Sequence, residues 1–308
     1  MKINNQRHSF HVLFNRLLVF IFICSALFIL IQLIPVNTIK ETTFNKESNK
    51  PLVIAHRGGA GVAPENTLYA FRVSERLGVD AIELDVRMSK DGELVVIHDE
   101  TVDRTTNGVG FVSNLTLKEL KSLDAGYRLK MRDRGYPFRH KGITIPTLEE
   151  VFQEIKHTSI VLELKDTNPT VEKKVAKLIK KYDMKKRVIV GSFNDDSIKR
   201  FADRTDGKVA IGTGSKALRF YVILHKLHLD RLYPLKRNAV QIPVKVGNIN
   251  LTTDRLIKTI KERNIAIHYW TINDEKTMKK LIKKNVDGII TDYPNKLLKL
   301  LNDDYKEM

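Results

Sequence analysis

The sequence predicts an α/β protein, a (β/α)8 TIM barrel that follows one N-terminal transmembrane helix. Short apolar runs alternate with helix-length amphipathic segments from Leu52 onward, which is typical of parallel β-α-β units. Eight such units fit in about 250 residues, the usual size of a closed barrel of this class. An almost unbroken apolar run, residues 17–34, precedes them. An open, doubly wound sheet is the alternative that the same alternation allows.

The apolar run at residues 17–34 is interrupted only by Ser25 and Gln32. As a helix it would span about 27 Å, close to the hydrocarbon thickness of a bilayer. Three basic residues precede it: Lys2, Arg7 and Arg16. The positive-inside rule therefore places the N-terminus in the cytoplasm and the barrel outside the membrane. We expect residues 1–16 to be cytoplasmic, residues 17–34 to form the anchor, and the polar residues 35–50 to form a juxtamembrane linker.

A cleaved signal peptide is the main alternative to an anchor, because it too has a basic start and an apolar middle. The apolar run is longer than a usual signal core, and no Ala-x-Ala site follows Ile34, which favours an uncleaved anchor. The chain has one cysteine, Cys24, so it cannot form an intramolecular disulfide. The bulky residues Ile21, Phe22 and Ile23 before this cysteine argue against a lipoprotein site.

The composition is that of a globular protein with a substantial core, since 42% of the 308 residues are hydrophobic and 29% are charged. The formal net charge of +17 attracts anions in general, including phosphodiesters and anionic lipid headgroups. A solvated basic surface explains the charge equally well. No helix-turn-helix, zinc spacing or aromatic RNA-binding signature accompanies it, so we expect no nucleic-acid partner.

The predicted strands are short apolar runs, at residues 52–55, 81–85, 160–165, 188–191, 209–211, 239–242, 265–270 and 288–290. The predicted helices carry apolar residues at helical spacing, at residues 68–77, 171–180, 195–201, 253–263 and 275–284. Asn66 is the expected N-cap of the first of these helices, and Gly78 ends it. Clear periodicity is missing between Thr105 and Thr147.

Polar side chains gather at the ends of the predicted strands. Glu83 and Asp85 lie two residues apart on one strand and therefore point to the same face. A parallel barrel brings the carboxyl ends of its strands to one mouth, where the active site lies. The residues late in a strand or just after one are His56, Glu83, Asp85, Glu163, Lys165, Gln241, Trp270 and Asp292. Two carboxylates on one face, with His56 and His98 at neighbouring strand ends, indicate a hydrolytic site with a bound cation.

These residues belong to an ordered set of motifs that resembles the glycerophosphodiester phosphodiesterase family, in its membrane-anchored bacterial type. The motifs are His56-Arg57-Gly58, Pro64-Glu65-Asn66-Thr67, Glu83-Leu84-Asp85, Ser89-Lys90-Asp91-Gly92, His98-Asp99, Arg104-Thr105-Thr106, Ile145-Pro146-Thr147-Leu148, Glu163-Leu164-Lys165, Trp270-Thr271-Ile272-Asn273 and Asp287-Gly288-Ile289-Ile290-Thr291-Asp292. The ordered set is hard to obtain by chance. The resemblance implies a catalytic barrel at residues 51–301, with a small insertion after the second strand at about 105–147, and a tail at 302–308.

The resemblance also implies roles for the strand-end residues. Glu83, Asp85 and Glu163 would hold a divalent cation, and an all-oxygen set suits Mg²⁺ or Ca²⁺. His56 and His98 would carry acid–base catalysis, in an order that the sequence leaves open. Arg57 and Lys165 would hold the phosphate oxygens. Substrate contacts by Gln241 and Trp270 are weaker expectations, since each suits plain packing as well.

The same residues could also have purely structural roles. A strand-end carboxylate could form a structural ion pair, and His56 could be a hydrogen-bonded histidine of the core. Glu65 and Asn66 suit a turn and a helix cap better than catalysis.

The expected reaction is hydrolysis of a glycerophosphodiester to glycerol 3-phosphate and an alcohol at the outer face of the membrane. The alternative within the same fold is a phospholipase-like enzyme that acts on lysophospholipids or on glycerophosphate polymers of the cell envelope. A non-catalytic receptor for polyol phosphates is a third hypothesis, but such a protein is free to lose His56, His98 or a carboxylate, and none is missing. The partners we expect are a small-molecule or lipid-derived phosphodiester and the membrane. The oligomeric state is not indicated.

Residues 216–237 depart from the pattern expected of this family, because they mix many large apolar residues with many basic ones. The apolar residues are dense enough for this segment to be the outer helix that follows the fifth strand. The alternative hypothesis is that part of it rests on the membrane, with apolar residues inserted and basic residues on anionic headgroups.

Overall fold

The structure is a computed structural model that describes residues 2–45 and 50–303. The described chain forms two compact units. We call residues up to Asn37 together with Arg219–Leu235 the stem unit, and residues Thr38–Leu218 together with those from Lys236 onward the barrel unit. The predicted linker falls partly, and the predicted tail mostly, on residues outside the described ones, namely 46–49 and 304–308.

The barrel unit is built on eight parallel strands that neighbour one another in the order β6-β5-β4-β2-β1-β11-β10-β7. These strands are β1 (Leu52–Ala55), β2 (Ala81–Met88), β4 (Ser159–Leu164), β5 (Val188–Gly191), β6 (Ala210–Ile211), β7 (Ala239–Ile242), β10 (Ala266–Tyr269) and β11 (Gly288–Thr291). A parallel bridge between Gly212 and Ala239 joins the two ends of this order. The predicted TIM barrel is therefore confirmed over the open sheet, whose two edge strands do not meet.

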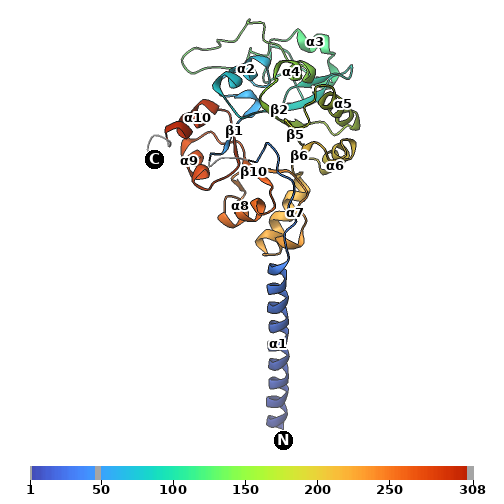
Figure 1. Ribbon diagram of the computed structural model, residues 1–308, viewed down its shortest axis with the longest axis vertical. Coiled ribbons are helices and arrows are strands. Elements are labelled where there is room, and N and C mark those ends of the chain that lie inside the picture. Colours follow the sequence, from blue (N-terminus) through green and yellow to red (C-terminus); the bar gives the residue numbers. More distant parts are fainter. Residues whose placement is uncertain (1, 46–49, 304–308) are drawn as a thin grey trace. The chain divides into compact units, whose positions relative to one another are not determined.

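Helices surround these strands (Figure 1). They are α2 (Leu68–Leu77), α4 (Leu148–Glu154), α5 (Pro169–Lys181), α6 (Asp195–Arg204), α8 (Asp254–Lys261), α9 (Glu275–Lys283) and α10 (Pro294–Asp303). Most begin at a Thr, Asn or Asp whose side chain accepts a hydrogen bond from the first turn. The expected cap of α2 was wrong by one residue: Thr67, not Asn66, accepts the hydrogen bond from the Ala70 N–H, at 3.2 Å.

The insertion after β2 begins with β3 (Leu94–Val96), which runs antiparallel to β2. It continues through η2 (Val112–Asn114) and α3 (Leu117–Lys121), and returns to the barrel at Thr147, which bridges to Val95. The excursion has a small apolar core of its own, formed by Val95, Ile97, Val102, Val112, Leu120, Ala125, Ile143 and Ile145. A short hairpin, β8 (Lys245–Val246) with β9 (Ile249–Asn250), follows β7.

Part of the predicted linker is inside the barrel. Phe44 is fully buried in an apolar cluster with Ala81, Ala239 and Ala266, which are the first residues of three barrel strands. Its carbonyl oxygen accepts a hydrogen bond from His268 Nε2, at 2.9 Å. The described residues 38–45 therefore help to close the amino end of the barrel. A polar stretch with one isolated phenylalanine carries no periodicity that would have predicted this.

The stem unit contains α1 (Lys2–Leu33), part of α7 (Ser215–Lys226) and η3 (Asp230–Leu232). Within α1, Leu13–Leu33 has a mean hydropathy of 2.5 and none of that stretch is buried. The helix is long and apolar enough to cross a membrane, and a signal sequence near the N-terminus passes the same test.

Candidate functional site

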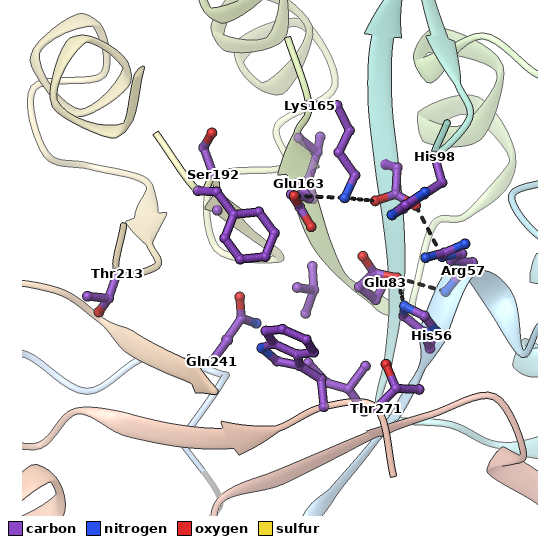
Figure 2. Close-up of a pocket in the computed structure, with 17 residues that line it drawn as sticks. His56, Arg57, Glu83, His98, Glu163, Lys165, Ser192, Thr213, Gln241 and Thr271 are labelled. Carbon is purple, nitrogen blue, oxygen red and sulfur yellow. Dashed lines mark hydrogen bonds and ion pairs between the residues drawn. The ribbon is translucent and has the colours of Figure 1, made fainter. Parts of the chain in front are cut away.

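A pocket lies where the carboxyl ends of the barrel strands meet (Figure 2). All nine residues predicted for the site line it: His56, Arg57, Glu83, Asp85, His98, Glu163, Lys165, Gln241 and Trp270. They come from β2, β4 and β7 and from the turns that follow β1, β3, β4 and β10. The same pocket is also lined by Ser192, Phe193 and Thr213, which no sequence motif predicted as site residues.

The turn after β1 sets the first two of these side chains. This turn, η1 (His56–Gly58), has Arg57 at φ 51° and Gly58 at φ 79°, both in the left-handed region. A Cβ on Gly58 would lie 2.6 Å from the Phe71 ring, so no other residue fits there. The turn aims the Arg57 backbone N–H at Glu83, to whose Oε2 it donates a hydrogen bond of 2.8 Å.

Three carboxylates, Glu83, Asp85 and Glu163, form a cluster whose ligand atoms lie within 4.8 Å of one another. Strand register produces this cluster: Asp85 pairs with Glu163 across β2 and β4, and Glu83 lies two residues earlier on the same face. Burial, reinforced by the charge of Asp85, raises the pKa of Glu83 to about 8. Burial also raises the pKa of Glu163, although Lys165 opposes the shift. Burial and mutual repulsion therefore disfavour the negative charge of Glu83 and of Glu163.

Two basic side chains contact the carboxylates. Lys165 Nζ lies 3.1 Å from Asp85 Oδ1 and 2.8 Å from Glu163 Oε1. Arg57 Nε lies 3.6 Å from Asp85 Oδ2. Burial alone would raise the pKa of Asp85, but Lys165, His98, Asn66 and Arg57 together outweigh burial and hold that pKa below its usual range. A structural ion pair thus accounts for Asp85 and Glu163 but not for Glu83, whose carboxylate meets a backbone N–H and, at 4.0 Å, His56 Nε2.

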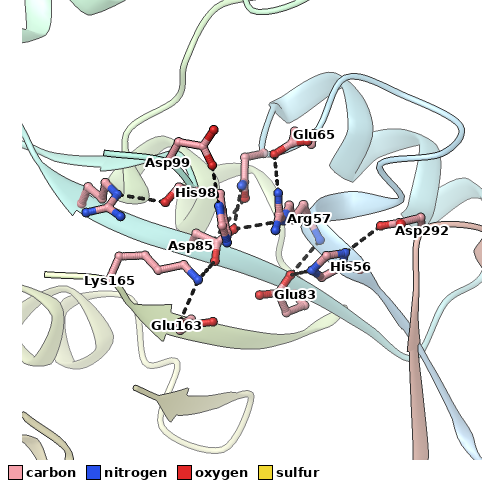
Figure 3. Close-up of polar contacts among 12 residues, drawn as sticks. His56, Arg57, Glu65, Glu83, Asp85, His98, Asp99, Glu163, Lys165 and Asp292 are labelled. Atoms are coloured by element: carbon pink, nitrogen blue, oxygen red, sulfur yellow. Dashed lines mark hydrogen bonds and ion pairs between the residues drawn. The ribbon is translucent and has the colours of Figure 1, made fainter. Parts of the chain in front are cut away.

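Each of the two histidines donates a hydrogen bond to a carboxylate (Figure 3). His56 Nδ1 lies 2.6 Å from Asp292 Oδ1, and His98 Nδ1 lies 2.7 Å from Asp99 Oδ1. Burial lowers the pKa of His56, but Asp292 and Glu83 outweigh it and the net direction is upward. Burial also lowers the pKa of His98, and there the nearby carboxylates do not reverse the direction. The two imidazoles therefore differ in basicity although both have an aspartate partner.

Comparison with known proteins agrees with this geometry. Residues 56–296 match the Glycerophosphoryl diester phosphodiesterase family. The chain belongs to this family. It is 39% identical over 260 residues to the glycerophosphodiester phosphodiesterase of Caldanaerobacter subterraneus subsp. tengcongensis, a match that covers 82% of this chain and 98% of that relative. The resemblance of the ordered motifs is confirmed.

Two further proteins are similar to this chain. A human lysophospholipase D is 27% identical over 275 residues, covering 81% of this chain and 85% of its own length. The solved structure of an Oleispira antarctica phosphodiesterase, in complex with the product sn-glycerol-3-phosphate, superposes with a TM-score of 0.65. That enzyme is 28% identical, and the match covers 82% of this chain and 97% of the other.

In this chain, a series of ion pairs links Arg57, which follows His56, to Asp99, the partner of His98. Glu65 accepts hydrogen bonds from Arg57 at 2.8 Å and from Arg104 at 2.7 and 2.8 Å. Arg104 in turn donates to Asp99 at 2.6 and 3.1 Å. Arg104 holds the pKa of Asp99 down at about 2. Glu65 is therefore more than the turn residue that we expected, because it couples the arginine beside one histidine to the partner of the other.

Asn66 also has a different place from the expected helix cap. Its side-chain amide donates to Asp85 Oδ2 at 2.9 Å, and its amide oxygen accepts from the Asp85 N–H at 3.3 Å. Asn66 has φ 56°, which turns its side chain back from the start of α2 toward β2. The motif Pro64-Glu65-Asn66-Thr67 was the only signal for these contacts, and it gave no direction for the side chains.

The opposite wall of the pocket is aromatic. Phe193 and Trp270 meet edge to face, with ring centroids 6.1 Å apart and an interplanar angle of 83°. Phe193 is 56% exposed, and Lys165 Nζ lies 5.8 Å from its ring centroid. Gln241 lies deeper, with Nε2 at 3.5 Å from Nδ1 of the buried His268. Phe193 follows β5 by two residues, so its position after a strand end was the one signal that could have predicted it.

Proposed function

We propose that this chain hydrolyses glycerophosphodiesters to glycerol 3-phosphate and an alcohol. The observation that carries the proposal is the pocket itself, in which a cluster of three carboxylates lies beside two histidines that each have an aspartate partner. The relatives support the same reaction class, since one is a glycerophosphodiester phosphodiesterase and another was solved with sn-glycerol-3-phosphate as its product.

Glu83, Asp85 and Glu163 are the residues that would hold a divalent cation, Mg²⁺ or Ca²⁺. The donor set fits such an ion for two reasons. All of its ligand atoms are oxygen, and burial disfavours the negative charge of Glu83, which a bound cation would stabilise. When bound, the cation supplies Lewis-acid polarisation of the phosphate. Lys165, which contacts two of these carboxylates, remains close enough to share the phosphate charge.

The other side chains divide binding from proton transfer. Arg57 and Lys165 hold phosphate oxygens, Arg57 through its planar guanidinium and Lys165 as a point charge. Asp292 and Asp99 fix Nδ1 of their histidines, which leaves Nε2 of each ring for the substrate. One imidazole activates the attacking oxygen and the other protonates the leaving alkoxide, each with an effect on the order of 10²–10⁴-fold. Trp270 forms the wall against the glycerol portion, and Gln241 contributes a polar contact below it.

A second candidate substrate is a lysophospholipid. The exposed ring of Phe193, next to Trp270, extends the apolar wall of the pocket toward solvent. Such a surface suits a leaving group that carries an acyl chain better than it suits a small polar alcohol. The lysophospholipase D among the relatives supports this alternative.

The proposal includes the location of the enzyme. We infer that residues 17–34 form an uncleaved anchor, that residues 1–16 are cytoplasmic and that the barrel lies outside the membrane. The apolar stretch of α1 and the basic residues before it support this topology. Because Phe44 belongs to the barrel core, we place the start of the catalytic unit near Thr38 rather than at residue 51. Mass measurement of the chain from isolated membranes would detect cleavage near Ile34.

The reaction is tested with the full chain in detergent, by measuring glycerol 3-phosphate release from glycerophosphocholine and from lysophosphatidylcholine in mixed micelles. We expect turnover that EDTA abolishes, that Mg²⁺ or Ca²⁺ restores, and that His98→Ala removes. Glu275→Gln, an exposed position on α9, is the matched surface control. Faster turnover of lysophosphatidylcholine would favour the second candidate substrate, and absence of turnover on both substrates would overturn the proposal.

A further inference from the structure

The α7–η3 segment, which we define as residues Arg219–Leu235 of the stem unit, exposes an apolar stripe. Phe220, Ile223, Leu227 and Leu232 are exposed by 51%, 51%, 58% and 50%. The first three follow one another at intervals of three and four residues, so they lie on one face of the helix and its immediate extension. Tyr221 and His225, which lie between them in sequence, are buried. The stripe is therefore the outward face of the segment.

The charges beside the stripe have one sign. Arg219, Lys226 and Arg231 are basic, and Asp230 is the one acidic residue in the sequence of the segment. Asp230 is buried, with Oδ1 at 3.7 Å from His225 Nδ1, whereas Arg219 and Lys226 are exposed. Large apolar residues flanked by cations are the composition that binds the interface of an anionic bilayer.

The segment contacts the end of α1 within the stem unit. Gln32 Nε2 donates to the His228 carbonyl oxygen at 2.8 Å, and Arg231 donates to the Ile34 carbonyl oxygen at 2.7 Å. The Phe28 ring meets the His228 ring with centroids 6.3 Å apart. The apolar stretch of α1 ends at Leu33, so these contacts hold the segment beside the end of the proposed anchor (Figure 1).

We propose that the α7–η3 segment is a second membrane contact, lying in the outer interface of a bilayer that contains anionic phospholipid. Phe220, Ile223, Leu227 and Leu232 enter the headgroup and acyl boundary, while Arg219 and Lys226 meet lipid phosphates. This proposal rests on the proposed anchoring by α1. It deepens that function, because a segment fixed to both α1 and the lipid surface restricts how the anchored chain moves about its anchor.

The test uses the full chain in phosphatidylcholine vesicles with and without phosphatidylglycerol. An environment-sensitive fluorophore is attached at Leu227→Cys in a Cys24→Ser background. The control is Val109→Cys in the same background, a barrel-unit position that is 77% exposed. The native Cys24, labelled in the unchanged chain, reports separately whether α1 lies in the bilayer. Glycerol 3-phosphate release by each labelled chain verifies that it is folded.

We expect the probe at residue 227 to be quenched by lipid-borne nitroxide, shielded from aqueous iodide and shifted to shorter wavelength than the probe at residue 109. Arg219→Gln combined with Lys226→Gln should reduce the shielding in vesicles with phosphatidylglycerol more than in those without it.

Equal iodide quenching at residues 227 and 109, with Cys24 quenched from the lipid, would overturn the second contact and leave the anchor standing. Shielding of residue 227 from both quenchers would show cover by protein, such as a second copy, and would also overturn it. If Cys24 itself is not quenched from the lipid, the anchor fails and the second contact fails with it.

Discussion

The two ends of the barrel are filled by opposite kinds of side chain. At the carboxyl end, Glu83, Asp85 and Glu163 bring three carboxyl groups close together, beside Lys165. At the amino end, Phe44 fills the centre of an apolar cluster. Buried carboxylates cost stability and are typical of reactive sites, whereas buried aromatic rings supply stability. The same eight strands thus hold the carboxylate cluster at one end and the apolar cluster of Phe44 at the other.

Histidines illustrate the difference. His56 donates to the carboxylate of Asp292, which favours the charged imidazole, and the pKa of His56 is raised. His268 donates to the carbonyl oxygen of Phe44 from a fully buried position, and burial lowers its pKa. The partner and the degree of burial, rather than the residue type, decide whether a histidine is available to move a proton.

The largest expected effect is at the carboxyl end. Glu83→Gln keeps the shape of the side chain but removes a carboxylate that we propose to bind the cation. We expect turnover of glycerophosphocholine to fall by about 10²–10³-fold. We also expect the Tm in EDTA to be at least as high as that of the unchanged chain, because burial and Asp85 disfavour the Glu83 charge. Steady-state glycerol 3-phosphate release and thermal unfolding in detergent measure the two effects.

Added Mg²⁺ or Ca²⁺ sharpens the same test. A cation that binds the folded chain raises the Tm of the unchanged protein, and Glu83→Gln should lose most of that rise. Glu275→Gln on α9 should behave like the unchanged chain in both measurements. If the Tm of Glu83→Gln in EDTA is well below that of the unchanged chain, the charge of Glu83 does not destabilise the carboxyl end of the barrel, and the prediction is wrong.

The opposite result is expected at the amino end. Phe44→Ala should lower the free energy of unfolding by about 3–5 kcal/mol, because it opens a cavity in a fully buried cluster. Since Phe44 does not line the pocket, turnover at a temperature well below the Tm should change little. Phe111→Ala, at a ring that is 50% exposed in the insertion, is the matched control. Loss of turnover in a Phe44→Ala chain that is still folded would show that the two ends are coupled.

This contrast also marks what the sequence could predict. The barrel strands and nine of the residues that line the pocket were predictable, because a parallel barrel brings strand ends together and because the ordered motifs resemble a known family. Phe44 was not, since it packs on residues more than 190 positions away, such as Ala239, and its neighbours in sequence are polar. The same limit applies to Asp292, which the motifs contained but which no pattern could pair with His56.

A smaller effect is expected at Asp292 and Asp99, the partners of the two histidines that we propose to be catalytic. Asp292→Asn and Asp99→Asn should each lower kcat by about 10–100-fold, as the loss of an orienting partner does at comparable sites. KM should change little, because neither carboxylate is among the residues that line the pocket. Asp292 also accepts a hydrogen bond from Asn273 at 2.6 Å, so Asn273→Ala tests whether orientation of Asp292 matters as well. A rise in KM without a fall in kcat would assign these aspartates to substrate binding instead.

The smallest expected effect concerns His268 and pH. Because burial holds the pKa of His268 below its ordinary 6.5, the folded chain keeps this imidazole neutral while the unfolded chain can take up a proton. Its contribution to stability is complete above pH 6.5 and is lost as the pH falls toward the pKa in the folded state. At pH 5.5 the loss from this one group is at most about 1.4 kcal/mol, since the unfolded chain binds one proton more than the folded chain.

His268→Gln isolates this term, because an amide can still donate to the Phe44 carbonyl oxygen but does not titrate. The measurement is thermal unfolding of both chains at pH 7.5 and 5.5, followed by the fluorescence of the single tryptophan, Trp270. The unchanged chain should lose more stability between these values than His268→Gln does. The other histidines remain in both chains, so their titration cancels in the difference. Identical pH dependence would mean that His268 takes up a proton in the folded barrel, and the amino end would then be less closed than its contacts with Phe44 imply.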